Sequence, residues 1–227
     1  MSEPEARQSR TQCNLPLGGV RVVDLTSVIL GSFATQMLGD LGAEVLKIET
    51  PPADGVATPG DIMRWAGTAP VPGMGPLFLG FNRNKRSLAL DLRQPTARAQ
   101  LDELIATADV FVASLRMSSL AKLGLDYARL SQRNPRLIYA HACGFGSDGP
   151  YAGLPAYDDL IQAASGSADL WPRCMASAQN EAVDAGDGRQ APRYLPGLMA
   201  DKSVGLYLAN AILAALFQRQ RLQQEQA

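Results

Sequence analysis

The alternation of hydrophobic and polar positions in residues 21–49 predicts a strand, a helix and a second strand in direct succession. RVVDL and EVLKIE are short apolar runs, and the apolar residues of the segment between them recur at helical spacing. The connecting turn, residues 26–32, contains Gly31 but lacks the closely spaced glycines that bring a pyrophosphate onto a helix N-terminus in dinucleotide sites. The pattern therefore predicts one unit of a nucleotide-binding type of fold without its usual ligand signature.

The same rhythm of strands and helices continues along the chain. Further strands are predicted at residues 87–92, 110–112 and 136–143. Helices are predicted at residues 96–107, 120–133 with a break at Gly124, 157–165 and 201–223. Residues 50–75, rich in proline and glycine, and the polar residues 176–190 are predicted to be irregular. Strands alternating with helices indicate an α/β fold, an open Rossmann-like and mostly parallel sheet with helices on both faces.

Composition is that of a soluble globular chain. Of the 227 residues, 46% are hydrophobic and 19% are charged, and the formal net charge is -1. Such a charge gives no general drive toward nucleic acid or an anionic membrane, so any anion-binding surface must be local. The longest apolar run, residues 204–217, is too short for a bilayer span and predicts a buried or half-buried helix.

The cysteines indicate a reducing compartment. Cys13, Cys143 and Cys174 are widely separated and form no CxxC pair, so neither a disulfide framework nor a thiolate metal site is predicted. Residues 1–14 lack the apolar core of a secretory signal and are expected to form a mobile arm before one domain, residues 15–227. We therefore expect a cytoplasmic protein without a bound metal.

A series of sequence blocks resembles the class III coenzyme A transferases, the family of formyl-CoA and carnitine CoA-transferases that also contains alpha-methylacyl-CoA racemase. Each block alone is weak, but their order and spacing hold from about residue 15 onward. The blocks are LGGVRVVDLT (17–26), GDLGAEVLKIE (39–49), NRNKRSLALDL (82–92), ADVFV (108–112), LGL (123–125), NPRLIY (134–139), GFG (144–146), GP (149–150), YD (157–158), QA (162–163) and SG (165–166).

The resemblance implies an enzyme that moves coenzyme A between carboxylic acids, with Asp201 as the acyl acceptor. In the family this carboxylate attacks the acyl-CoA thioester to give an aspartyl anhydride. CoA then returns to give an aspartyl-CoA thioester, from which the acceptor acid takes CoA. Such covalent catalysis divides one hard transfer into steps of comparable energy. The alternative for Asp201 is an ordinary first-turn aspartate, favoured by orphan N–H groups and the helix dipole.

The resemblance places the CoA site at strand ends and adjoining loops, where open α/β sheets gather their ligands. Arg93, Arg116 and Lys122 are expected to meet the phosphates. The other implied positions are Ile29, Leu30, Leu90, Asp91, Leu92, Ser114, Leu115, Tyr157 and Asp158. Coenzyme A or acyl-CoA is expected as a substrate, together with a small carboxylic acid, and no permanently bound cofactor is expected.

Two further sets of side chains leave a choice between a site and a structural role. The basic cluster Arg83, Lys85 and Arg86 could meet a phosphate or could be a solvated loop before a strand. The one histidine, His141, matches no catalytic position of the family and is expected to be a hydrogen-bonded core residue. The racemases of the family use a histidine where this chain has Tyr157, so acyl-CoA racemisation is less favoured.

Two other classes of function stay open at this stage. Family chains continue through a second small domain and back into the first, and two chains interlock, so this chain corresponds to the N-terminal half. A non-catalytic CoA-binding subunit, or one polypeptide of a split enzyme, is therefore an alternative. A homodimer or a complex with a chain that supplies the other half is also expected. A nicotinamide dehydrogenase is the remaining alternative, supported by the strand-helix-strand unit and by Glu49 after the second strand.

Overall fold

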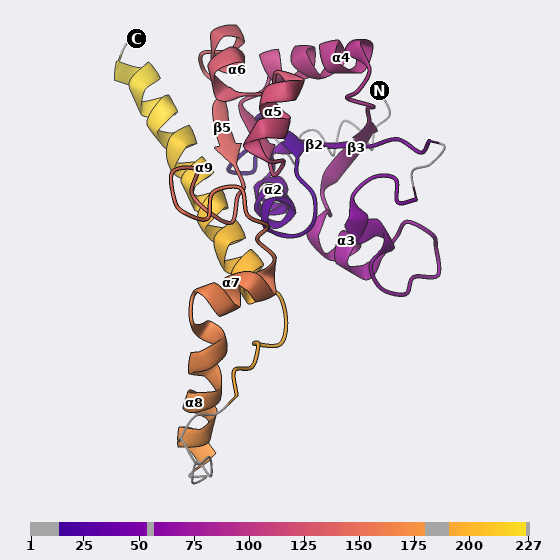
Figure 1. Ribbon diagram of the computed structural model, residues 1–227. Coiled ribbons are helices and arrows are strands. Elements are labelled where there is room, and N and C mark those ends of the chain that lie inside the picture. Colours follow the sequence, from indigo (N-terminus) through magenta and orange to yellow (C-terminus); the bar gives the residue numbers. More distant parts are fainter. Residues whose placement is uncertain (1–13, 54–56, 180–190, 226–227) are drawn as a thin grey trace. The chain divides into compact units, whose positions relative to one another are not determined.

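A computed structural model of the protein describes residues 14–53, 57–179 and 191–225 (Figure 1). The chain divides into two compact units. Unit 1 contains Met1–Ala142 and Gly205–Ala227, and unit 2 contains Cys143–Val204.

A five-stranded parallel sheet forms the centre of unit 1. Its strands are β1 (Arg21–Leu25), β2 (Glu44–Glu49), β3 (Lys85–Ala89), β4 (Val110–Ala113) and β5 (Ile138–His141). They lie in the order β3-β2-β1-β4-β5, and every neighbouring pair is parallel. This sheet confirms the predicted α/β fold. β3 begins two residues before the predicted strand and ends before Leu90, because Lys85 belongs to the strand and the chain turns away after Ala89.

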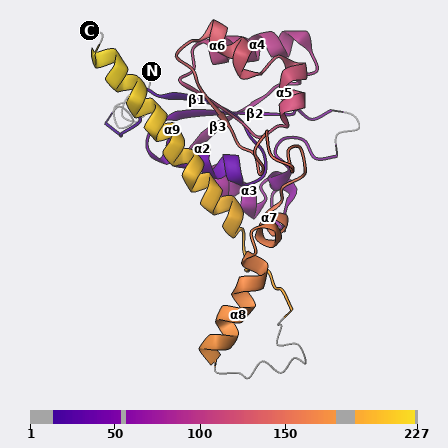
Figure 2. The same cartoon turned by 60° about the vertical axis from the view of Figure 1, so that its left-hand side comes forward.

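Helices cover both faces of the sheet in unit 1 (Figure 2). They are α2 (Leu30–Asp40), the 3-10 helix η1 (Ile62–Trp65), α3 (Pro76–Phe81), α4 (Pro95–Ala106), α5 (Met117–Leu123), α6 (Tyr127–Arg133) and the larger part of α9 (Met199–Glu225). Successive strand side chains point to opposite faces. Accordingly, Val23 packs with residues of α4, α5 and α6, whereas Val22 packs with residues of α2 and α9.

Close helix packing in unit 1 depends on two glycines. A Cβ atom at Gly31 of α2 would lie 2.5 Å from Cγ2 of Thr26, at the end of β1. A Cβ atom at Gly205 of α9 would lie 2.8 Å from the backbone oxygen of Leu30. Both distances are shorter than van der Waals contact, so only glycine lets α2 approach β1 and α9 approach α2 this closely.

The predicted break at Gly124 separates two helices. Gly124 has φ 68 and ends α5, and the side chain of Asp126 then accepts a hydrogen bond from the backbone N–H of Arg129 at the start of α6. A left-handed glycine followed by an aspartate N-cap is a usual way to end one helix and begin the next.

By length and composition alone, α9 would suffice to cross a membrane. Within unit 1, however, Ile212 of this helix is 1% exposed and belongs to the same core cluster as Leu38 and Val45. Ile212 therefore packs as a core residue, but only 17% of the apolar window of α9 is buried, and the helix is longer than the run that was judged too short for a bilayer span.

Unit 2 contains α7 (Asp158–Ala164), α8 (Ser167–Gln179) and the first turn of α9. The predicted helix at 157–165 is confirmed by α7. Residues 176–179 were predicted to be irregular, and this is wrong because α8 extends to Gln179 despite Pro172 in its interior. The rest of that polar segment, residues 180–190, and residues 1–13 of the predicted arm lie outside the described residues.

Candidate functional site

A cleft of about 530 Å³ opens at the carboxyl ends of the strands in unit 1. Its walls come from the ends of β1 and β2, the segment after β3 and the segment after β4. The predicted CoA residues that line it are Leu90, Asp91, Leu92, Arg93, Ser114 and Leu115. The cleft therefore lies where an open parallel sheet places its ligands, and it gathers residues from two separate predicted segments.

The other CoA positions predicted in unit 1 do not line this cleft. Ile29 is 1% exposed at the start of α2, so its side chain belongs to the core, and Leu30 is the first residue of that helix. Arg116 precedes the first residue of α5 and Lys122 lies in its last turn, both exposed. That these four residues take part in CoA binding stays a prediction.

Arg93, one of the predicted phosphate ligands, already has an anionic partner. Its Nε lies 2.8 Å from Oδ1 of Asp91, and the guanidinium is largely exposed. The Asp91 carboxylate raises the pKa of Arg93 through this hydrogen bond. A phosphate that reaches Arg93 would therefore compete with Asp91 for the same N–H groups.

Glu49 lies in the wall of the cleft, but other residues of unit 1 occupy its carboxylate. It forms an ion pair of 2.6 Å with Arg64, accepts a hydrogen bond from Ser87, and accepts the backbone N–H of Asp61 at 2.9 Å. Burial alone would raise the pKa of Glu49, but these partners outweigh it and lower the pKa to about 2. In dinucleotide sites an acidic residue at this place holds the ribose, and Glu49 is already committed to Arg64. This arrangement weighs against the dehydrogenase alternative.

A group of buried charges that sequence analysis missed lies in unit 1, and one of its members, Asp61, belongs to the lining of the cleft. Nζ of Lys47 lies 2.9 Å from Oδ2 of Asp61, and Nζ of Lys85 lies 3.0 Å from Oδ2 of Asp24. All four side chains are at most 2% exposed. Buried charges are tolerated only when paired and hydrogen-bonded. A signal was present in the sequence, because Asp24 and Lys47 interrupt apolar strand runs.

The basic cluster Arg83, Lys85 and Arg86 is divided among different surroundings. Arg83 pairs with Asp40, where its Nη2 lies 2.5 Å from Oδ2, and Lys85 belongs to the buried pair with Asp24. Arg86 is exposed on β3. The three side chains therefore do not form one anion site, and the interpretation as a wholly solvated loop is also wrong for Lys85.

In unit 2 the structure brings together two of the predicted site residues, Asp158 and Asp201. Oδ1 of Asp158 accepts the backbone N–H of Asp201 at 2.9 Å, in the first turn of α9. Asp158 is buried and begins α7, whereas Tyr157 before it is 64% exposed. Asp158 thus satisfies one of the N–H groups that a helix start leaves without an intrahelical partner.

Gln162, one turn after Asp158 on α7, fixes the other carboxylate oxygen. Its Nε2 donates to Oδ2 of Asp158 at 2.6 Å, and its Oε1 accepts the backbone N–H of Leu195 at 2.8 Å. Gln162 was recognised only as part of a sequence block and not as a site residue. Its contacts link α7 to the segment that leads into α9.

The carboxyl group of Asp201 is a weaker acid than that of an ordinary aspartate. Burial, followed by the negative charge of Asp158, raises the pKa of Asp201 from its ordinary value to about 6. The side chain is half-buried, and it makes no ion pair with any residue that the structure describes. A carboxylate with such a pKa is still ionised near neutral pH and is more basic than usual, which suits a nucleophile or a general base.

Comparison with known proteins identifies the family. The sequence profile described as CoA-transferase family III matches residues 17–227. The chain belongs to CoA-transferase family III. The family assignment confirms the resemblance found in the sequence blocks.

Relatives and solved structures of family III agree with this assignment. Succinate–glutarate CoA-transferase of Agrobacterium fabrum is 35% identical over 212 residues, 91% of this chain and 48% of that protein. The succinyl-CoA–L-malate CoA-transferase beta subunit of Chloroflexus aurantiacus is 36% identical over 213 residues, 93% of this chain and 47% of that protein. A CAIB/BAIF family protein from Brucella suis, known from a crystal structure, superposes with a TM-score of 0.78 at 36% identity, covering 92% of this chain and 51% of that one. This family III chain spans about half the length of the relatives it matches.

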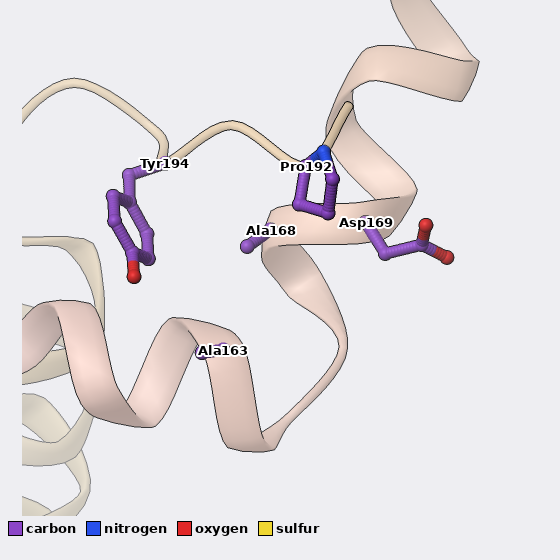
Figure 3. Close-up of a pocket in the computed structure, with 5 residues that line it drawn as sticks. All are labelled: Ala163, Ala168, Asp169, Pro192 and Tyr194. Atoms are coloured by element: carbon purple, nitrogen blue, oxygen red, sulfur yellow. The ribbon is translucent and has the colours of Figure 1, made fainter. Parts of the chain in front are cut away.

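Unit 2 of this family III chain also contains a small pocket of about 240 Å³ (Figure 3). Its lining residues are Ala163, Ala168, Asp169, Pro192 and Tyr194. In Figure 3 the carboxylate of Asp169 points away from the ring of Tyr194, and it pairs with Arg173 one turn later on α8. None of the predicted site residues lines this pocket, so it carries no part of the assignment.

His141 makes a hydrogen bond, as expected from the sequence, but it is only partly buried and not a core residue. Its Nε2 lies 2.8 Å from the carbonyl oxygen of Leu115, and because a carbonyl oxygen only accepts, this nitrogen donates. Across residues 14–53, 57–179 and 191–225, no cluster of His, Cys, Asp and Glu side chains is arranged to hold a metal ion.

Proposed function

We propose that this chain supplies the CoA-binding cleft and the nucleophilic carboxylate of a CoA-transferase that moves coenzyme A between carboxylic acids. The observation that carries the proposal is the environment of Asp201, at the position where the family resemblance expects the acyl acceptor. This carboxylate lacks a cationic partner among the described residues, and its pKa is raised to about 6.

The reaction follows from the chemistry of a carboxylate nucleophile. Asp201 attacks the thioester carbon of the donor, the C–S bond breaks, and CoA leaves as the thiolate while an aspartyl anhydride forms. The thiolate attacks the aspartyl carbonyl of the anhydride and releases the donor acid. An acceptor carboxylate then attacks the aspartyl-CoA thioester, which breaks the C–S bond, releases the thiolate and forms a second anhydride. The thiolate finally attacks the acceptor carbonyl of this anhydride, giving the new acyl-CoA and releasing Asp201 as the free carboxylate. Each step exchanges one acyl bond for another, so no oxidant, metal or external proton donor is needed.

Asp158 and Gln162 support this role by their contacts. Asp158 holds the backbone of Asp201 through the N–H of the first helical turn, and its charge contributes to the raised pKa. A more basic carboxylate is a stronger nucleophile as long as it stays ionised at the working pH. Gln162 keeps Asp158 oriented by binding its second oxygen.

Chemical trapping of the acyl-enzyme tests the proposal. Protein that binds CoA is incubated with an acyl-CoA and then treated with hydroxylamine or borohydride, and the peptides are analysed by mass spectrometry. The proposal expects modification at Asp201, none in Asp201→Asn, and retained modification in Asp159→Asn. Asp159 is a suitable control because it is an exposed carboxylate on the same helix as Asp158. Unmodified Asp201 in CoA-competent protein would contradict the proposed chemistry.

Salt dependence tests the proposed phosphate contacts. CoA carries phosphates that Arg93, Arg116 and Lys122 would meet, whereas pantetheine carries none. CoA should therefore bind more weakly as the salt concentration rises, and pantetheine should bind almost independently of salt. Equal salt dependence of the two ligands would exclude these contacts.

The second candidate function is a subunit that works only with another chain. The name of one relative favours it, because that relative is called a beta subunit. In addition, Leu206, Tyr207 and Phe217 of α9 are 44%, 76% and 63% exposed. Exposed apolar side chains of this size are typical of a surface that a partner covers.

Light scattering and mixing experiments distinguish the two candidates. A homodimer or a hetero-complex should give more than one chain per particle at micromolar concentration. Activity that appears only after a second chain is added would favour the subunit, whereas trapping of Asp201 in this chain alone would favour the complete enzyme. Racemisation is less supported, because Tyr157 stands where the racemases of the family use a histidine. A cytoplasmic location stays a prediction.

A further inference from the structure

The turn between β1 and α2 has a strained backbone. Val28 has φ 69, in the left-handed region that glycine occupies without cost. Valine is branched at Cβ, so this conformation crowds its side chain against the backbone. A conformation of this kind persists only when the surrounding structure holds it in place.

Asp61, at the start of η1, is the group that holds this turn. Its Oδ1 accepts the backbone N–H of Val28 at 3.2 Å and the hydroxyl of Ser27 at 3.1 Å. The same oxygen accepts the N–H of Met63 at 3.0 Å, and the residue is 2% exposed. One carboxylate therefore ties the β1–α2 turn to a segment more than thirty positions later in the chain.

Lys47 fixes the other oxygen of Asp61 and also reaches both ends of the turn. Its Nζ lies 2.9 Å from Oδ2 of Asp61, donates to the backbone oxygen of Thr26 at 2.9 Å, and lies 3.2 Å from the hydroxyl of Ser32. Since Thr26 and Ser32 are the first and last residues of the turn, one buried ammonium contacts both of its ends. A buried ion pair with this many hydrogen bonds is stiff, because any movement leaves a charge without a partner.

The far side of the same turn forms part of the cleft in unit 1. Thr26, Ser27 and Ser114 all line it. The backbone N–H of Ser27 donates to the hydroxyl of Ser114 at 3.0 Å, which joins the end of β1 to the end of β4. The backbone conformation of Val28 therefore affects the position of the part of the cleft lining formed by Ser27 and Ser114.

We infer that Asp61 is a positioning residue for the ligand cleft: with Lys47 it holds Val28 in the left-handed conformation and so fixes the wall of Ser27 and Ser114 against which CoA lies. Asp61 belongs to the lining of the cleft, but its carboxylate is fully buried and hydrogen-bonded to the turn, so we assign its effect to the position of Ser27. The inference rests on the proposed function, because it takes CoA as the ligand of this cleft.

A compensating substitution tests the inference in the intact chain. Asp61→Asn should weaken the binding of CoA, measured by calorimetry, by about 10- to 100-fold, the equivalent of releasing one strained residue. It should also shift the amide resonance of Ser27 in the ligand-free protein. The double variant Asp61→Asn/Val28→Gly should recover the affinity to within about threefold of the parent, because glycine adopts the turn conformation without help. Val28→Gly alone should bind nearly as well as the parent protein.

Asp102→Asn is the matched control. Asp102 is a partly buried carboxylate of unit 1 that pairs with Arg129 and Arg133 and does not line the cleft. Its substitution should leave both the Ser27 resonance and the CoA affinity unchanged.

Each outcome of these experiments either supports or overturns the proposed role of Asp61. An Asp61→Asn variant that loses affinity without recovery by Val28→Gly would show a general structural role and overturn the inference. Unchanged CoA affinity together with an unchanged Ser27 resonance in Asp61→Asn would also overturn the inference. If Asp61→Asn does not fold, folding and CoA binding by the double variant would support the inference, and failure of both variants to fold would overturn it. If the parent does not bind CoA, the proposed function fails, and the Ser27 resonances of the ligand-free variants still decide whether Asp61 positions the turn.

Discussion

Two aspartates, one in each unit, have opposite electrostatic surroundings. Burial alone would raise the pKa of Asp24 in unit 1, but the ammonium groups of Lys85 and Lys47 outweigh it, and the pKa is lowered to about 2. Asp201 in unit 2 is less buried, yet burial and the charge of Asp158 raise its pKa to about 6. The two residues differ in the sign of the charge beside them and not in their chemistry.

The comparison separates a structural charge from a reactive one. Asp24 is neutralised by lysines and hydrogen-bonded by Thr26 and Thr35, so it is committed to the fold. Asp201 has its backbone held and its carboxylate left without a cation among the described residues. Removing the first should therefore cost stability, and removing the second should cost function but gain stability.

The largest expected effect is that of Asp24→Asn. The substitution leaves Lys85 without its carboxylate partner in the interior, and it should lower the free energy of unfolding by about 3–5 kcal/mol near neutral pH. Urea denaturation measures this loss. Because the pKa of Asp24 is depressed, its contribution is complete above its ordinary pKa and is lost as the pH falls through about 2. The difference between parent and variant should therefore shrink in acid.

Two control variants make this first test specific to the buried pair. Asp102→Asn, which breaks a partly exposed ion pair, should cost only about 1 kcal/mol or less. Asp24→Val combined with Lys85→Met removes both charges and should cost less than Asp24→Asn alone. A double variant as unstable as Asp24→Asn would mean that the unpaired charge of Lys85 does not cause the loss of stability.

The sequence predicted the sheet of unit 1 well, because β1, β2, β4 and β5 are short runs rich in apolar residues, whereas β3 is largely polar and its predicted bounds were shifted. It missed α3 and α8. Pro76 begins α3 and Pro172 lies inside α8, and no helix was predicted at 76–81 or over the first part of α8. A proline in the first turn of a helix lacks only an N–H that would be unpaired anyway, so this residue does not exclude a helix.

The candidate site was predicted only in part. Family resemblance brought out Asp201, Asp158 and several residues that line the cleft of unit 1. It did not bring out the buried charges of unit 1, because the partners of Lys47 and Lys85 lie on other segments and no local pattern pairs them. Lysines are usually exposed, so the place of Lys47 in an apolar run was the only local signal, and its carboxylate partner becomes evident only in the folded chain.

The second prediction is that Asp201→Asn raises the free energy of unfolding, whereas Asp24→Asn lowers it. The folded-state pKa of Asp201 is raised to about 6, so ionising this residue costs the folded protein stability. The cost is absent below the ordinary pKa of an aspartate and complete above about pH 6. Asp201→Asn should therefore abolish acyl transfer and, at pH 8, raise the free energy of unfolding by about 1–2 kcal/mol, with no gain at pH 4. Thermal unfolding at the two pH values measures it, and a loss of stability at pH 8 would mean that Asp201 has a cationic partner.

The third prediction separates the two causes of the raised pKa. Asp158→Asn keeps an oxygen that can accept the N–H of Asp201 but removes the negative charge. The pKa of Asp201 should fall from about 6 toward its ordinary value, and the acid limb of the trapping rate should move to lower pH. At pH 5 the trapped fraction should rise about threefold relative to its plateau. Asp159→Asn is the control, and an unmoved acid limb in Asp158→Asn would assign the whole shift to burial.

The smallest effect is expected for Asp91, a third aspartate that is paired like Asp24 but in contact with solvent at the rim of the cleft, where its side chain is 22% exposed. Its pKa is lowered by hydrogen bonds from Arg93, yet a pair in contact with water contributes almost nothing to stability because water and salt screen it. Asp91→Asn should leave the melting temperature unchanged within error. It should nevertheless strengthen CoA binding about two- to fivefold at low salt, since the guanidinium of Arg93 no longer has a competing carboxylate, and this gain should disappear at about 1 M salt. Weaker binding in Asp91→Asn would instead make Asp91 a ligand of CoA in its own right, or show that it must hold Arg93 in place.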